Sequence, residues 1–416
     1  MAMTKKPVKG MKDILPEEMA IRDYAINLIM ETYKGFGFTP IETPTMEHIG
    51  NLNSKEGGET EKLIFKVLKR GQKLDLDKAA NENDLVDSGL RYDLTVPLCR
   101  YYSNNSEILP APFKALQVGS VYRADRPQRG RFRQFTQCDI DILGDPTNLA
   151  EIELILATTT LLGKLEFSNF KVHINDRRFL KAMAAYAGFP EDRTDVVFII
   201  LDKMDKIGWE GVQEELLKEG FGEESVAKYV ALFEHMGTGK EAIAYLAEQL
   251  GSFLDPAAVQ NLNEIIDAVD ALKTADFELA FDATLVRGMG YYTGTIFEIE
   301  MLDFGSACGG GGRYDELIGK FTGMKVPACG FSIGFERIIT LLLERGFKVP
   351  GAAAKKAYLI EKGMNAEGIR KVLEQAQEER ASGMTVAVSM RNKNAKFQKD
   401  QLTKEGYTEI VDVYKK

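Results

Sequence analysis

Near the start of the chain, the spacing of apolar residues changes from one typical of a helix to one typical of a strand. Between Pro16 and Gly35 the apolar residues recur at intervals of three and four. This spacing, with a proline at its start and a glycine at its end, predicts one amphipathic helix. Residues 38–44 are apolar but carry two prolines, so we expect an edge strand or an interface segment there.

Residues 90–97 alternate between apolar and polar side chains and end in a proline. The pattern predicts a short strand followed by a helix that starts near Pro97. On such a strand Asp93 and Thr95 would share one face. Thr95 would equally suit a purely structural role as a cap of that helix.

Residues 121–144 predict a β-hairpin, with alternation on both sides of a Pro-Gln-Arg-Gly turn. Five arginines fall within eleven residues: Arg123, Arg126, Arg129, Arg131 and Arg133. Strict alternation would place one set of side chains on a single face: Arg131, Arg133, Phe135, Gln137, Asp139 and Asp141. Taken alone, the charges are also typical of a solvated surface hairpin.

The rest of the chain divides into three parts. A helical pattern broken by glycine-containing turns occupies about 178–275, and we interpret it as an insertion in a strand-rich domain that covers 1–345. Four glycines at 309–312 are not followed by Gly-Lys-Ser/Thr, which argues against a phosphate-binding loop of that type. Residues 346–356 predict a linker, and 357–416 predict a small βαβαβ domain.

Composition narrows the classes of function. A net charge of −9 argues against a protein that coats nucleic acid nonspecifically. The four cysteines are far apart, which favours reduced thiols, and the three histidines are isolated, which disfavours a histidine metal site or a Ser-His-Asp triad. There is no 18-residue apolar run and no signal sequence, so we expect a cytoplasmic protein that does not enter membranes.

Polar residues of three kinds lie in three separated segments of the chain. They are the arginines Arg123, Arg131, Arg287 and Arg337, the aspartates Asp93, Asp125 and Asp141, and the tyrosines Tyr292 and Tyr314. Guanidinium groups bind phosphate oxygens in pairs and stay charged, which suits a reaction that builds negative charge on phosphorus. A carboxylate nucleophile would need no general base. Individually, the tyrosines suit packing roles as well, and Asp125 or Asp139 would suit pairing with neighbouring arginines.

These segments resemble the histidyl-tRNA synthetase family, which belongs to the class II aminoacyl-tRNA synthetases. The similarity lies in six segments in the same order: KGMKDILPEE, LRYDLTVPLCRY, the arginine hairpin, LVRGMGYYTGTIFE, GGGGRYDEL and GFSIGFERI. Together they span nearly the whole chain. The resemblance implies an α+β fold with an antiparallel class II sheet, flanking helices, the helical insertion and a small C-terminal α/β domain, in a homodimer.

The resemblance also implies an activity. L-histidine and ATP, with Mg²⁺ on the phosphates, would give histidyl-adenylate, and the histidyl group would then pass to the 3′ end of tRNA(His). Arg123 would hold the α-phosphate, Asp125 would face the adenine edge, Arg131 would reach the outer phosphates and Arg337 would stack on the adenine. Arg287 would be the principal catalytic cation, together with Arg123, and no protein metal site is implied.

The amino acid would be recognised at both ends. Asp93, Thr95 and Gln137 would meet the α-ammonium group, and Arg287 would lie by the substrate carboxylate. The imidazole would be recognised by Asp141, Tyr292 and Tyr314, because a carboxylate and a phenol suit a ring with two nitrogens. At the tip of the hairpin, Arg126 and Arg129 would contact phosphates of the tRNA acceptor end.

The chain departs from the family's pattern in two places. Met289 and Gly290 stand where the family usually has Leu-Asp, so a carboxylate that orders this loop is missing. The C-terminal domain resembles the family's anticodon-binding domain but ends after its third strand, so we expect an incomplete sheet. An alternative function is a regulatory paralogue, such as the regulatory subunit of ATP phosphoribosyltransferase. The retained arginines favour the enzyme.

Overall fold

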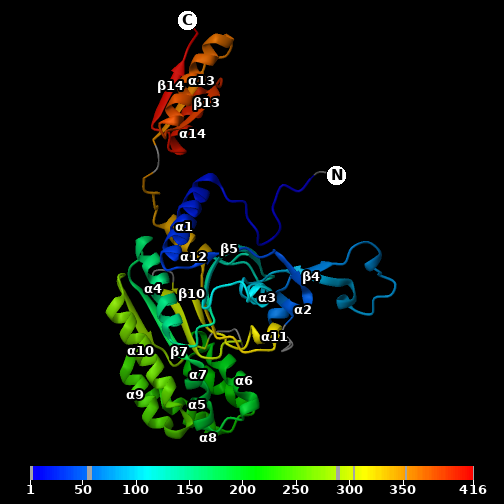
Figure 1. The fold of residues 1–416 in the computed structure, drawn as a ribbon, viewed down its shortest axis with the longest axis vertical. Coiled ribbons are helices and arrows are strands. Elements are labelled where there is room, and N and C mark those ends of the chain that lie inside the picture. The colour runs from blue at the N-terminus through cyan, green and yellow to red at the C-terminus, as the bar shows by residue number, and fades with distance from the viewer. Residues whose placement is uncertain (1–2, 54–58, 287–290, 303–304, 352–353, 416) are drawn as a thin grey trace. The chain divides into compact units, whose positions relative to one another are not determined.

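The computed structural model describes residues 3–53, 59–286, 291–302, 305–351 and 354–415 (Figure 1). The chain divides into two compact units. The larger contains Met1–Asp13 and Arg22–Arg345, and the smaller contains Ile14–Ile21 and Gly346–Lys416. We describe each unit by itself.

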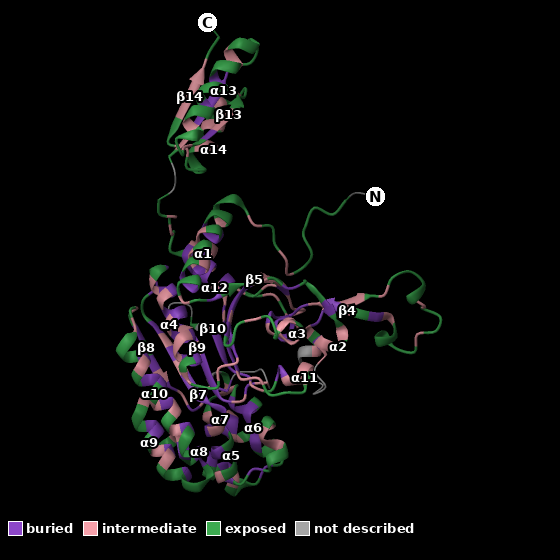
Figure 2. Ribbon diagram, viewed as in Figure 1, coloured by how far each residue is buried: buried purple, intermediate pink, exposed green. Residues whose placement is uncertain are grey.

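An eight-stranded sheet forms the centre of the larger unit, in agreement with the antiparallel sheet that the family resemblance implies. Its strands, in spatial order, are β1 (Thr39–Pro40), β5 (Phe113–Tyr122), β6 (Gln134–Leu143), β11 (Ala328–Ile333), β10 (Ser306–Arg313), β9 (Thr295–Met301), β7 (Phe170–Asp176) and β8 (Phe277–Phe281). Every neighbouring pair is antiparallel except the outermost two, β1 with β5 and β7 with β8. Figure 2 shows that buried residues follow these strands.

The hairpin of β5 and β6 is present, with its tip at Gln128–Arg131, where the two end residues form a backbone bridge. Gly130 adopts a φ of 67°, a left-handed conformation that glycine accommodates without steric cost. The regular pairing begins only at Gln134. Arg131 and Arg133 therefore do not continue the strand face that carries Asp139 and Asp141, contrary to the alternation predicted from the sequence.

Helices α4 (Leu149–Lys164) and α12 (Phe335–Glu344) pack against the central strands, and α1 (Pro16–Gly35) contacts both helices. The bounds of α1 agree with those that its apolar spacing and terminal residues predict. Two buried ion pairs fix these helices. Arg22 of α1 binds both carboxylate oxygens of Glu336 at 2.7 and 2.8 Å, and Arg313 of β10 binds both oxygens of Glu151 at 2.7 and 2.6 Å.

A second antiparallel sheet of three short strands, β2 (Met46–His48), β4 (Val86–Leu90) and β3 (Lys66–Leu68), adjoins α2 (Ile49–Leu52) and α3 (Thr95–Asn105). The strand predicted over 90–97 is wrong, because β4 ends at Leu90 and α3 already begins at Thr95. Asp93 explains the early start: its Oδ1 accepts the backbone N–H of Val96 at 3.1 Å and so stabilises the first turn. Pro97 is tolerated in that turn.

Six helices occupy Arg177–Leu272, where the sequence indicates a helical segment. They are α5 (Arg177–Ala187), α6 (Thr194–Leu201), α7 (Met204–Lys218), α8 (Glu223–Glu234), α9 (Gly239–Leu250) and α10 (Pro256–Leu272). Aromatic residues form part of their core, with the Phe189 ring centroid 5.0 Å from that of Phe221 and 5.4 Å from that of Tyr229. Helices α9 and α10 pack against the outer strands β7 and β8.

The smaller unit contains a parallel sheet in the order β13-β12-β14. Its elements are β12 (Lys355–Ile360), α13 (Ala366–Ala381), β13 (Thr385–Met390), α14 (Ala395–Lys404) and β14 (Glu409–Val413). This is the βαβαβ order that the sequence predicts. Strand β12 starts two residues before the predicted boundary at 357, so Lys355 and Lys356 belong to the sheet rather than to the linker 346–356.

All four cysteines are buried thiols that take part in no disulfide bond. Among the described residues, no helix combines the length and the apolar character that crossing a bilayer requires.

His173 of β7 lies between two carboxylates. Its Nδ1 is 3.2 Å from Asp282 Oδ2 and its Nε2 is 3.0 Å from Glu300 Oε2. The hydrogen bond with Asp282 is the largest cause that raises the pKa of His173 from 6.5 to about 9, against the opposing effect of burial. Charged His173 therefore stabilises the folded protein below pH 6.5, and this contribution is lost as the pH rises through 9.

We predict that the free energy of unfolding falls by at most about 3 kcal/mol between pH 6.5 and 9 because of His173. Denaturant titrations at pH 6, 7.5 and 9 would measure it. In His173→Gln this part of the pH dependence should disappear, since glutamine does not titrate. Equal pH profiles for the two proteins would contradict the assignment.

Candidate active site

Strand β6 carries three buried polar side chains on one face. Gln137, Asp139 and Asp141 are 8%, 3% and 3% exposed, respectively. The neighbouring strand leaves space for the last of them, because Gly330 of β11 pairs with Asp141. A Cβ atom at residue 330 would overlap the Asp141 carboxylate, so glycine at this position is needed for the carboxylate to lie over the sheet.

Asp141 and Tyr314 form a buried pair. The Tyr314 hydroxyl donates to Asp141 Oδ1 at 2.5 Å, and Tyr314 is 2% exposed. Burial raises the pKa of Asp141 to about 7, the hydrogen bond from Tyr314 opposes that rise, and nearby Asp93 adds to it. A packing role alone does not explain Tyr314, because its hydroxyl holds a specific carboxylate.

Tyr291 and Tyr292 lie beside this pair. The ring centroid of Tyr291 is 6.0 Å from that of Tyr314, in an edge-to-face arrangement, and 4.8 Å from that of Tyr292. Tyr292 is buried. The structure therefore brings Asp141, Tyr292 and Tyr314 into one aromatic and acidic cluster, although they come from β6, the segment before β9 and the end of β10.

A second group of polar atoms has unfilled hydrogen-bonding capacity. Three of the buried oxygens that have no hydrogen-bond partner among the described residues belong to β6 and the turn before α3: Asp93 Oδ2, Gln137 Oε1 and Asp139 Oδ1. The Gln137 amide is oriented by its Nε2, which donates to Ser332 Oγ at 2.8 Å. Burial raises the pKa of both Asp93 and Asp139. Unpaired acceptors of this kind are costly in a folded protein, and they mark a place where a cationic donor would be stabilised.

Thr95 is the first residue of α3 and is half-buried. It follows Asp93 by two residues, and both belong to the turn that opens the helix rather than to one face of a strand. The helix-capping role considered for Thr95 is filled by Asp93, whose carboxylate accepts backbone N–H groups of this turn.

Arg123 is held with its guanidinium group in a fixed orientation. Its Nε donates to the carbonyl of Tyr92 at 2.9 Å, and the group lies 5.2 Å from the ring centroid of Phe135. Its charge lowers the pKa of Asp93, in opposition to burial. Arg123 therefore lies close enough to the buried carboxyl group of Asp93, just before α3, to lower its pKa.

Arg337 lies in the first turn of α12 and is half-buried. Its positive charge lowers the pKa of the Cys308 thiol, although burial dominates and raises that pKa to about 11. This places the guanidinium group near β10. Arg287 lies outside the described residues.

The arginines of the hairpin tip have different surroundings. Arg126 and Arg131 are exposed. Arg129 forms an ion pair with Glu344 at 2.6 Å, and both side chains are about half exposed, so the pair contributes little stability. Asp125 accepts Arg133 Nε through its backbone carbonyl at 3.1 Å, and its carboxylate forms no ion pair with a described arginine. The pairing considered for Asp125 and Asp139 is therefore not what the structure shows.

Sequence reasoning missed two contributors to this site. Ser332 orients Gln137, and Gly330 makes room for Asp141, yet neither residue type carries a chemical signal by itself. Only the register of β11 against β6, which sets Ser332 opposite Asp139 and Gly330 opposite Asp141, reveals them.

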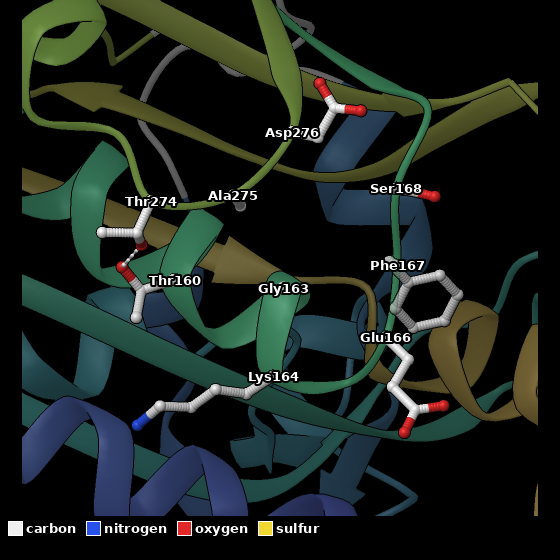
Figure 3. Close-up of a pocket in the computed structure, with 9 residues that line it drawn as sticks. All are labelled: Thr160, Gly163, Lys164, Glu166, Phe167, Ser168, Thr274, Ala275 and Asp276. Atoms are coloured by element: carbon white, nitrogen blue, oxygen red, sulfur yellow. Dashed lines mark hydrogen bonds between the residues drawn. The ribbon is translucent and has the colours of Figure 1, made fainter.

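A separate surface hollow lies where the end of α4 meets the residues that follow α10 (Figure 3). Thr160 and Thr274 face one another there, with their hydroxyl oxygens 3.5 Å apart, and Lys164, Glu166 and Asp276 complete a polar rim. None of the residues of the candidate active site lines it.

The family model described as "Histidyl-tRNA synthetase" matches residues 10–338. The chain belongs to the histidyl-tRNA synthetase family. A histidine–tRNA ligase of Leifsonia xyli is 42% identical over 422 residues, which cover 99% of this chain and 96% of the relative. One from Christiangramia forsetii is 40% identical over 83% of this chain and 78% of the relative. The family also explains why six ordered segments match.

Solved structures of this family share the fold. The histidyl-tRNA synthetase of Nostoc sp. PCC 7120 superimposes with a TM-score of 0.80 at 27% identity, covering 99% of this chain and 92% of that one. A Bacillus halodurans protein described as an ATP phosphoribosyltransferase regulatory subunit/histidyl-tRNA synthetase has a TM-score of 0.77 at 21% identity, with full coverage of both chains. At that identity the similarity concerns the fold alone.

We predict that Tyr314→Phe raises the pKa of Asp141 above its value of about 7, because the substitution removes the hydroxyl that stabilises the carboxylate. Carbon-13 NMR of the Asp141 carboxyl carbon, followed through a pH titration, would measure the change. Tyr291→Phe is the matched control, since the Tyr291 hydroxyl forms a hydrogen bond with Tyr292 and its contact with Tyr314 is between the rings. A lower or unchanged pKa in Tyr314→Phe would contradict the prediction.

Proposed function

We propose that the chain is a histidine–tRNA ligase. It would activate L-histidine with ATP, releasing pyrophosphate and forming histidyl-adenylate, and then transfer the histidyl group to the 3′ end of tRNA(His). The observation that carries this proposal is the buried Asp141–Tyr314 pair beside three unpaired buried oxygens. The names of the relatives, at 42% identity over nearly the whole chain, support it.

The Asp141–Tyr314 pair suits the imidazole of histidine. A carboxyl group with a pKa of about 7 either accepts a hydrogen bond from a ring N–H or donates one to a bare ring nitrogen. Tyr292, buried next to the pair, would close the pocket around the ring. A side chain without ring nitrogens would leave Asp141 unpaired, and such sites discriminate strongly against that loss.

The opposite end of the amino acid would lie near Asp93, Thr95 and Gln137. The orphan oxygens of Asp93 and Gln137 are acceptors without donors, which is what an ammonium group requires. By its place in the family motif Arg287 would lie by the substrate carboxylate, with Arg123 at the α-phosphate. The carboxylate is already a nucleophile, so positioning and charge stabilisation supply the catalysis and no protein base is needed.

ATP would lie between the hairpin and α12. In this arrangement Arg123 holds the α-phosphate, Asp125 faces the adenine edge, Arg131 reaches the outer phosphates and Arg337 stacks on the adenine. Arg287 would be the principal catalytic cation by its place in the family motif, together with Arg123. Among the described residues no group of three His, Cys, Asp or Glu side chains is placed to hold a metal ion. We propose that Mg²⁺ enters as part of the MgATP substrate, held mainly by its phosphates.

Partners beyond the small substrates follow the same proposal. Arg126 and Arg129 at the hairpin tip would meet phosphates of the tRNA(His) acceptor end, where Arg129 would have to exchange its pair with Glu344. The unit of β12 to β14 would contact the anticodon region. We also propose a cytoplasmic homodimer, by family resemblance.

Histidine-dependent ATP–pyrophosphate exchange tests the proposed function directly. The purified chain should exchange labelled pyrophosphate into ATP when L-histidine is added, without tRNA, and the other nineteen amino acids should give no exchange. The alternative is a regulatory paralogue of the kind named in the description of the Bacillus halodurans protein, with which this chain shares the fold. No exchange with histidine at any pH from 6 to 9 would support that alternative instead.

We predict that Arg123→Ala lowers the exchange rate by roughly a hundredfold or more, the usual cost of removing one donor that stabilises a transition state. Arg370→Ala is the matched control, because Arg370 is an exposed arginine of α13 that pairs with Glu374, one helical turn away. The control should exchange at the unsubstituted rate. Equal rates for Arg123→Ala and the control would remove Arg123 from the catalytic assignment.

A further inference from the structure

Asp139 lies at the centre of the polar face of β6. It is paired in register with Gln117 of β5 and Ser332 of β11, and it is 3% exposed. Gln117 is occupied elsewhere, since its Nε2 donates to the Leu94 carbonyl at 3.1 Å and its Oε1 accepts from Thr43 at 3.4 Å. The Asp139 carboxyl group receives a long contact of 3.4 Å from Gln137 Nε2 to its Oδ2, and a hydrogen bond from the Ser332 side chain. Its Oδ1 has no partner among the described residues.

The charges around Asp139 do not compensate for its burial. Asp141 and Asp93 are acidic neighbours that raise its pKa further, while Ser332 and Arg123 oppose the rise. The negative charge of Asp139 also acts to raise the pKa of Arg91 and the pKa of Tyr33. The side chain of Arg91 is directed to backbone carbonyls, at 2.6 Å from Thr43 O and 2.9 Å from Ser120 O. Asp139 is therefore an acid without a cationic partner in this part of the structure.

The unpaired oxygens match one chemical group. Asp93 Oδ2, Gln137 Oε1 and Asp139 Oδ1 are three buried acceptors from the same region, and a primary ammonium group has three N–H donors and no acceptor. Asp141, by contrast, already has the Tyr314 hydroxyl. The free acceptors therefore fit the ammonium end of an amino acid rather than its side chain.

We propose that Asp139 is a further binding residue for the α-ammonium group of the substrate, and that binding this cation releases the proton that Asp139 holds in the free protein. The inference rests on the proposed function, which places an amino acid in this site. The proton balance is simple. The substrate keeps its R–NH₃⁺ form, the Asp139 carboxyl group becomes a carboxylate, and the proton passes to the solvent.

Burial supports the protonated free state. Desolvation is the largest cause of the raised pKa of Asp139, because a lone carboxylate in a low-dielectric surrounding is unfavourable. A bound ammonium group supplies the missing charge and reverses the preference. Binding of the cation and loss of the proton are thus coupled, and the affinity for the cation should increase as the pH rises.

Calorimetric titration with two matched ligands tests the proposal. Histidinol keeps the ammonium group and the imidazole, and its deamino analogue, imidazolepropanol, lacks only the ammonium group. Asp139→Asn should weaken histidinol binding at least about tenfold, because a charge-assisted hydrogen bond is lost, and should leave imidazolepropanol binding within about twofold. Titrations in buffers of different ionisation enthalpy should show fewer protons released by the variant than by the unsubstituted chain.

Controls separate this role from a structural one. Asp270→Asn, at an exposed position of α10, should change neither affinity. The melting temperature of Asp139→Asn should not fall, because the variant removes an unpaired buried acid; if it does not fold, Asp139→Ser gives the same comparison. Equal histidinol affinity and proton release in the variant and the unsubstituted chain would overturn this inference alone. Failure of the unsubstituted chain to bind histidinol would overturn the proposed function and the inference with it.

Discussion

The burial of carboxyl groups in the middle of an antiparallel sheet is the constraint on which the rest of the structure depends. Seven acidic side chains of the larger unit are nearly inaccessible to water: Glu47, Asp93, Asp139, Asp141, Glu151, Asp176 and Glu336. Glu151, Glu336 and Asp176 each bind an arginine through both carboxylate oxygens, and Glu47 pairs with Arg100. Asp93, Asp139 and Asp141 form no ion pair with a described arginine. An unpaired buried charge is costly. We therefore assign the acids that are paired with arginine to the stability of the fold, and the acids without such a partner to the binding of a ligand.

The paired glutamates set the geometry around the aspartates. Glu336 binds Arg22 of α1 and also accepts the backbone N–H of Thr136 at 3.1 Å, next to Gln137 in the hairpin. Glu151 ties α4 to β10, the strand that ends beside Tyr314. Breaking either pair would leave a buried charge unsatisfied, and would also release the strand that carries a site residue. Stability and site geometry are therefore maintained by the same contacts.

Backbone space is the second requirement for this arrangement. Gly330 leaves space for the Asp141 carboxylate, and Gly119 of β5 leaves space for the guanidinium group of Arg91. A Cβ atom at either position would overlap that group. Both are glycines with ordinary extended backbone, so their value lies in the absent side chain rather than in an unusual conformation. The glycine run 309–312 has a related place, as part of the central strand β10 paired on both sides.

The sequence by itself determined the periodic features and the family. The bounds of α1, the hairpin, the order of elements in the smaller unit and the polar alternation of Gln137, Asp139 and Asp141 all follow from local patterns, because helix and strand periods and turn residues are encoded locally. Only the tertiary structure decided which polar groups are satisfied. Tyr314 and Asp141 form a hydrogen bond although they are 173 positions apart in the sequence, and Glu344 and Arg129 pair although they are 215 positions apart. The start of the helix at Thr95 depends on a hydrogen bond from the backbone to the Asp93 carboxylate. Such partners are set by strand register and helix packing, which periodicity does not specify, and so the unpaired oxygens that point to a ligand become visible only in the folded chain.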